Sequence, residues 1–97
     1  MNISKSIINF SKRRNIDIEI LELDGVNQVW FSQIDKNGEV YSEPLFTMFN
    51  NQNDLTWKGN IYLPIEIKEE LPATISSERK LKEVIKFLEK ELAHVCI

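Results

Sequence analysis

The chain has 97 residues, a net charge of −3 and an apolar share of 42%. At this length we expect one domain over residues 1–97, which buries roughly 60 to 65% of the unfolded chain's surface. This composition excludes whole-chain disorder, and the single cysteine, Cys96, excludes a disulfide framework. The sequence has no signal-peptide pattern and no apolar run of the ~20 residues that span a membrane, so we expect a cytoplasmic protein without a membrane partner.

Charge is divided unevenly along the chain. Residues 1–15 carry four bases and no acid, residues 16–72 carry eleven acids and three lysines, and residues 73–97 carry five bases and four acids. The negative charge therefore belongs to the middle of the chain. A field of that sign attracts cationic partners and opposes polyanions.

The opening residues predict a helix over about Ser4 to Arg14. Ile3, Ile7 and Phe10 recur at helical spacing, and the cations of Lys12–Arg14 fall in the last turn, where they complement the helix dipole. We interpret this basic cluster as helix-end electrostatics on a solvated face. Contact with a nucleic acid or another phosphate is the alternative, which the acidic middle of the chain disfavours.

Residues 16–43 predict an antiparallel meander of three strands, over about Ile16–Leu23, Gln28–Asp35 and Glu39–Glu43. Apolar and acidic residues alternate in the first strand, as expected for one buried and one wetted face. The Asp24-Gly25 pair and the Asp35–Gly38 segment are typical of turns, and Pro44 ends the third strand. The second turn is similar to the start of an EF-hand loop, but Pro44 stands where such a loop needs a glutamate.

The alternation of the first strand slips by one residue. Isoleucines share one face over Ile16–Ile20, whereas Leu21 and Leu23 take the other face. Either a bulge lies at this slip or both faces of the strand end are covered. In the second strand Trp30 and Phe31 take opposite faces, so one of these aromatics is exposed or is covered by a later loop.

The third quarter of the chain is less regular. The apolar Leu45–Phe49 segment predicts a one-turn helix or a buried loop end, and the polar residues after it predict a mobile loop that carries Trp57 and a turn at 58–60. Ile61–Ile67 alternates cleanly and predicts a fourth strand. Pro64 restricts that strand to a sheet edge or a bulge, because proline has no amide hydrogen to donate.

Residues 78–95 have the clearest pattern in the chain. Ser76 or Ser77 caps a predicted helix over Glu78–Val95, whose apolar side chains form one stripe: Leu81, Val84, Ile85, Leu88, Leu92 and Val95. We expect this stripe to pack on the sheet; a dimer seam is the alternative, although the helix is shorter than coiled coils need. The predicted fold class is α+β, a two-layer domain with an antiparallel sheet of about four strands and both terminal helices on one face, in the order α-β-β-β-β-α.

Few residues support catalysis. His94 and Cys96 are the only histidine and cysteine, and their spacing does not place them on one helix face. A zinc site needs three or four ligands, and the three glycines fall in predicted turns rather than in a phosphate loop. Asp17 and Glu19 share a strand face and form the carboxylate pair that a hydrolytic site would use, but such pairs are ordinary on solvated strands. We expect a protein that is not an enzyme and uses no cofactor or metal.

These features favour a protein-binding factor. We expect a small acidic immunity- or antitoxin-type inhibitor that masks the active site of a basic partner such as a toxin nuclease, acts as a monomer or weak dimer, and has no nucleic-acid partner. The residues expected to bind are six carboxylates that stand together as one anionic surface, with one aromatic anchor in the 50–60 loop: Asp17, Glu19, Glu22, Asp24, Glu39, Glu43 and Trp57. The alternative is a small chaperone or oligomeric structural protein whose contact surface is the last helix or the Leu45–Phe49 segment.

Overall fold

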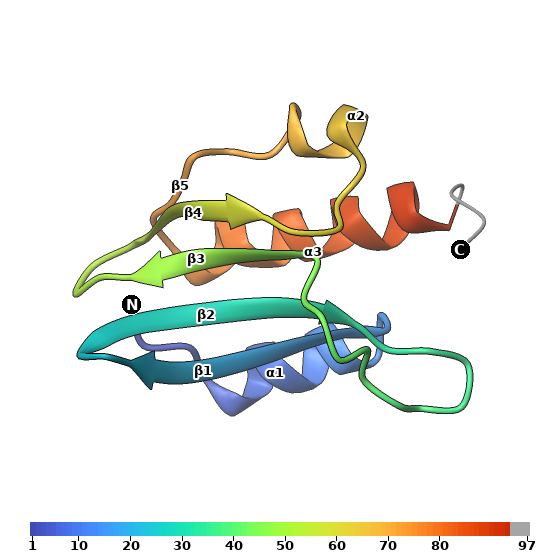
Figure 1. Ribbon diagram of the computed structural model, residues 1–97, viewed down its shortest axis with the longest axis horizontal. Coiled ribbons are helices and arrows are strands. Elements are labelled where there is room, and N and C mark those ends of the chain that lie inside the picture. Colours follow the sequence, from blue (N-terminus) through green and yellow to red (C-terminus); the bar gives the residue numbers. More distant parts are fainter. Residues whose placement is uncertain (94–97) are drawn as a thin grey trace.

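The helix predicted at the start of the chain is α1 (Lys5–Lys12) in the computed structural model, which describes residues 1–93 (Figure 1). The hydroxyl of Ser4 caps the helix by accepting a hydrogen bond from the amide of Ile7 at 3.4 Å. Ile7 and Ser11 are the buried residues of this helix. Asn15, with φ of 65°, takes the left-handed conformation that turns the chain into the first strand.

Strands β1 (Ile16–Leu23) and β2 (Val26–Gln33) form the predicted hairpin. Asp24 and Gly25 both have positive φ, 52° and 78°, as the tight turns of hairpins require. The register runs without interruption from one end of the hairpin to the other, so the predicted bulge is absent. The alternative, that both faces are covered, is also wrong: Ile20 and Leu23 lie on opposite faces and are 47% and 44% exposed.

Three further strands extend the hairpin into a five-stranded antiparallel sheet in the order β1-β2-β3-β4-β5. They are β3 (Phe46–Asn50), β4 (Leu55–Asn60) and the two-residue β5 (Thr74–Ile75). The strand predicted over Glu39–Glu43 is instead part of the connection between β2 and β3, where a single bridge joins Ile34 and Val40. The Leu45–Phe49 segment, predicted as a short helix or loop end, supplies most of β3.

The strand predicted over Ile61–Ile67 is also wrong. The side chain of Asn60 accepts a hydrogen bond from the backbone amide of Leu63 at 2.8 Å and donates one to the backbone carbonyl of Leu63 at 2.9 Å. These two hydrogen bonds close a turn over residues 60–63. Pro64 then precedes a short helix, α2 (Ile65–Lys68), because its missing amide hydrogen costs nothing at a helix start. Leu63 and Ile67 are buried and are four residues apart. Residues at this spacing share a face in a helix as well as in a strand, so the pattern does not distinguish the two.

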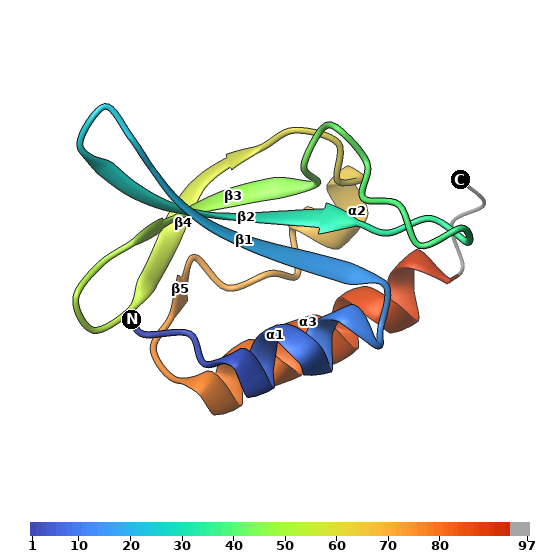
Figure 2. The same ribbon diagram turned by 90° about the horizontal axis from the view of Figure 1, so that it is seen from below.

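The last helix is α3 (Glu78–Leu92), capped by Ser77, whose hydroxyl accepts from the amide of Lys80 at 3.2 Å. Its predicted stripe is buried, namely Leu81, Val84, Ile85, Leu88 and Leu92; Val95 lies outside the described residues. Helices α1 and α3 lie side by side on one face of the sheet (Figure 2). The predicted α+β fold with both helices on one face is therefore confirmed, with five strands rather than about four.

A stack of three aromatic rings crosses the sheet on the side that faces the helices. The rings of Phe31 in β2 and Phe46 in β3 lie 4.5 Å apart between centroids and within 6° of parallel. Trp57 in β4 continues the stack, with its ring 5.2 Å from that of Phe46. Both phenylalanines are fully buried, so this stack ties the three central strands to one shared hydrophobic core.

Candidate functional site

The sheet face that points away from α1 and α3 is not covered by any helix within residues 1–93 (Figure 2). Strand register places alternate residues of the first four strands on it, and we call this surface the open face. Its residues are Asp17, Glu19, Leu21, Leu23, Val26, Gln28, Trp30, Ser32, Thr47, Phe49 and Thr56. A broad sheet surface that mixes apolar and polar side chains is a candidate contact surface for another protein.

Trp30 lies at the centre of the open face. It pairs with Glu19 in β1 and with Thr47 in β3, so it has neighbours on both sides. Its indole N–H donates to the side-chain oxygen of Gln28 at 3.1 Å, which fixes the orientation of the ring. Gln28 and Thr47 are buried although they lie on this face, and we attribute their burial to the large neighbouring indole of Trp30.

Two of the predicted carboxylates, Asp17 and Glu19, lie beside Trp30 on the open face. They occupy alternate positions of β1, and their partners in β2 are Ser32 and Trp30. Neither carboxylate forms an ion pair with a residue of the described chain, since the ion pairs there are those of Arg14 and Arg79. These two carboxylates therefore remain available to a cationic partner.

The other predicted carboxylates do not join them in one surface. Glu43 belongs to the segment that hydrogen-bonds to β2 from the side opposite β1, and Glu39 lies in the preceding loop. Glu22 is on the sheet face opposite to that of Asp17, and Asp24 is in the hairpin turn at the far end of β1. The expected continuous anionic surface is therefore wrong, because strand alternation and the length of the hairpin separate its members.

The predicted aromatic anchor, Trp57, does not lie in a mobile loop. It is a half-buried residue of β4, and its ring stacks on Phe46 on the side of the sheet that faces the helices. The loop between β3 and β4 is confined to Asn51–Asp54, where the Asn51 side chain donates to the carboxylate of Asp54 at 2.9 Å. The structure thus gives Trp57 a packing role in the core.

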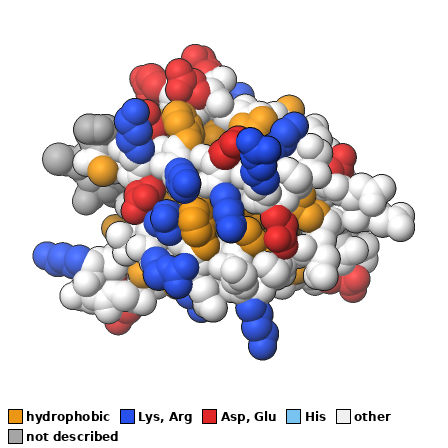
Figure 3. Space-filling model, turned by 180° about the vertical axis from the view of Figure 1, so that it is seen from behind, with side chains coloured by type: hydrophobic (Ala, Val, Ile, Leu, Met, Phe, Trp, Pro, Cys, Tyr) orange, Lys and Arg blue, Asp and Glu red, His pale blue; other side chains and the backbone are white. Residues whose placement is uncertain are grey.

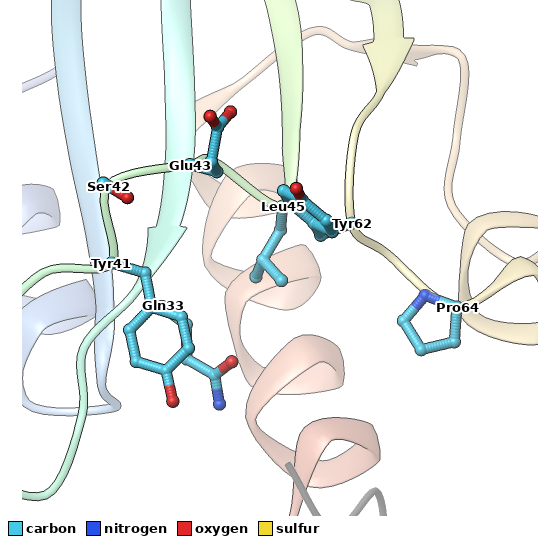
Figure 4. Close-up of a pocket in the computed structure, with 7 residues that line it drawn as sticks. All are labelled: Gln33, Tyr41, Ser42, Glu43, Leu45, Tyr62 and Pro64. Atoms are coloured by element: carbon cyan, nitrogen blue, oxygen red, sulfur yellow. The ribbon is translucent and has the colours of Figure 1, made fainter.

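A pocket of about 590 Å³ lies beyond the end of β2 (Figure 4). Leu45 and the rings of Tyr41 and Tyr62 contribute apolar surface, and the amide of Gln33 is a polar group in its wall. The Glu43 carboxylate points away from the Gln33 and Tyr41 side chains. Such a pocket suits an apolar side chain of a bound protein better than a charged group.

Residues 1–93 contain no histidine and no cysteine. Among residues 1–93, no three His, Cys, Asp or Glu side chains are grouped closely enough to hold a metal ion. The predicted candidates His94 and Cys96 lie outside the described residues. Within the same range, no helix combines the length and apolar character needed to cross a bilayer.

Trp30 is the residue of this surface that sequence reasoning did not select. Its alternation with Phe31 indicated that one aromatic would be exposed, but the sequence did not say which. The signal that identifies Trp30 is the hairpin register, because a two-residue turn at Asp24-Gly25 places it opposite Glu19.

No protein-family model, curated protein or solved structure matches this chain.

Proposed function

We propose that this protein is a non-enzymatic inhibitor of the immunity or antitoxin type, which binds a basic protein such as a toxin nuclease through its open face. The observation that carries the proposal is the oriented indole of Trp30 beside the carboxylates of Asp17 and Glu19, which form no ion pair within residues 1–93. Tryptophan in a fixed position is a frequent energetic centre of protein interfaces. Carboxylates at its edge steer a cationic partner and favour it over neutral or acidic proteins.

The first test is stoichiometric inhibition. The chain is purified with the protein that accompanies it in its native cells, and that protein is then separated and assayed with increasing amounts of the chain. We expect a basic partner whose activity falls to background at one equivalent. An acidic partner, or a partner whose activity is unchanged at saturation, would contradict the proposal.

The charge contribution is tested with the double variant Asp17→Asn/Glu19→Gln. We expect its association rate with that partner to fall about 10-fold at low salt, and the difference from the natural chain to disappear at high salt, because screening removes steering. The matched control is Glu66→Gln/Glu69→Gln, which makes the same change in net charge at exposed positions in and next to α2. Equal rates for the two double variants would show that the open face is not the docking surface.

A second candidate function is self-association, which the outer edge of β1 favours. This strand of eight residues is at the end of the sheet order, so its outer edge offers backbone groups for pairing. Exposed apolar side chains at the hairpin end, Ile20, Leu23 and Val26, would add buried area. Light scattering over a 100-fold range of concentration separates the two candidates. A monomer at every concentration would contradict self-association, and a stable dimer would favour the structural role.

A further inference from the structure

The cations of this protein gather on the side of the molecule opposite the open face. We define the helix layer as residues 4–14 and 77–93, which contain α1 and α3. It carries nine of the twelve Lys and Arg residues and four of the fifteen acids. Figure 3 shows Lys and Arg side chains spread across this layer. The acidic sequence therefore folds into a molecule with one cationic side.

Three lysines form a row along α3. Lys82, Lys86 and Lys90 recur every four residues, are exposed, and lie outside the stripe that packs on the sheet. Successive members of such a row are about 6 Å apart along the helix axis. Two acids of the same helix lie close to this row. Glu83 is 3.9 Å from Arg79 and Glu89 is 3.5 Å from Arg14, and neither forms an ion pair with a lysine of the row.

Phe10 of α1 lies between this row and Arg14, which follows the helix. The guanidinium of Arg14 lies over the Phe10 ring, 3.7 Å from its centroid, and the ammonium of Lys82 lies 5.4 Å from the same centroid. Arg14 also donates to the carbonyl of Phe10 at 3.1 Å and lies 3.5 Å from the carboxylate of Glu89. These contacts hold Arg14, which follows α1, and Lys82 of α3 beside one aromatic ring.

We propose that the helix layer binds the phosphate backbone of nucleic acids without regard to sequence. A regular row of cations matches a polymer of regular anions: duplex DNA carries one charge per about 1.7 Å of its axis, so several phosphates lie within reach of the row. Lys82, Lys86 and Lys90 contact phosphates, with Arg14 fixed beside them by Phe10. The proposal is independent of the proposed inhibitor function, which uses the opposite face.

The net negative charge of the protein does not oppose this contact at physiological salt. The shortest dimension of the molecule is 26 Å, whereas electrostatic interactions are screened over about 8 to 10 Å. An anionic membrane is a poorer occupant, because none of the large hydrophobic side chains that are exposed in residues 1–93 belongs to α1 or α3. Peripheral membrane binding needs such side chains to insert between lipids.

The test uses fluorescence anisotropy with labelled 20-nucleotide single-stranded and duplex DNA of two unrelated sequences. At 50 mM salt we expect a dissociation constant of about 10⁻⁵ M that is similar for the two sequences and rises with salt. The variant Lys82→Gln/Lys86→Gln/Lys90→Gln is expected to bind at least 10-fold more weakly and to lose about 2 to 3 from the slope of log K against log salt. Circular dichroism and a thermal melt check that the variant folds.

The matched control is Lys36→Gln/Lys58→Gln/Lys68→Gln, which makes the same change in net charge at exposed lysines outside the helix layer. We expect this control to bind DNA within about 2-fold of the natural chain. Equal weakening of both triple variants, or no binding by the natural chain at 50 mM salt, would overturn the proposal. Phosphatidylserine vesicles and poly-glutamate are measured in parallel, and tighter binding to either one than to DNA would assign the layer to a membrane or an acidic protein instead.

Discussion

Replacing Phe46 with alanine is expected to lower the free energy of unfolding by about 3 to 5 kcal/mol, the usual cost of removing a buried phenyl ring. Phe46 is the middle ring of the stack, so the substitution removes its contacts with both Phe31 and Trp57. Native domains are stable by only about 5 to 15 kcal/mol, so the variant would lose a large part of its stability. We expect its melting temperature to fall by more than about 10 °C.

Chemical denaturation monitored by circular dichroism measures this loss. Phe46→Leu is the matched control, because it keeps most of the buried volume while it removes the aromatic ring, and it should recover more than half of the stability. The exposed residue Tyr62 provides a second control, since Tyr62→Ala should change the free energy of unfolding by less than about 0.5 kcal/mol. A Phe46→Ala chain as stable as the natural one would mean that the ring stack does not hold the three strands together.

The second large effect concerns binding. Trp30→Ala is expected to weaken the complex with the inhibited partner by about 2 to 4 kcal/mol, a loss of roughly 30-fold to 1000-fold in affinity, because interface tryptophans often carry that much energy. The loss should come mainly from faster dissociation, since the steering carboxylates remain. Surface plasmon resonance at several salt concentrations separates the two rates.

Trp57→Ala is the informative comparison for this experiment. Its ring packs on Phe46 beneath the sheet, whereas that of Trp30 lies on the open face. We therefore expect Trp57→Ala to reduce stability and to leave the affinity of the folded fraction unchanged. If Trp57→Ala weakens binding and Trp30→Ala does not, the partner contacts a different surface and the open-face proposal fails.

The parts of the fold that the sequence predicts correctly are those set by local pattern. Ser4, Ser77 and the Asp24-Gly25 pair fix helix starts and a turn through their own backbone and side-chain geometry. The stripe of α3 needs no knowledge of its neighbours. Helices α1 and α3, the first hairpin and the two-layer arrangement follow from such signals.

The segment from residue 39 to residue 67 was mispredicted because its structure depends on distant neighbours. Both faces of β3 are shielded at Phe46, Thr47 and Met48, which are all buried, so its sequence lacks the alternation of an exposed strand. A register shift near Met48 accommodates an extra residue in β4, where Lys58 and Gly59 look like a turn.

The candidate site was predictable only in part. Asp17 and Glu19 share a strand face by simple alternation, and the structure keeps them together. Their grouping with Glu22, Asp24 and Glu39 rested on closeness in sequence, which does not measure distance across a sheet. The separation of charge between the open face and the helix layer required the fold itself, because α1 and α3 come from opposite ends of the chain.

That meeting of the two helices also constrains how the chain reaches its native state. Sheet strands pair only with the next strand in order, so hairpins can form within short stretches. By contrast, the amide of Ser4 donates to the carboxylate of Glu78 across 74 positions, and Arg14 reaches Glu89. During synthesis on the ribosome, much of the apolar sheet face that α3 covers therefore stays in contact with water until α3 emerges. The chain is most exposed to aggregation during that interval.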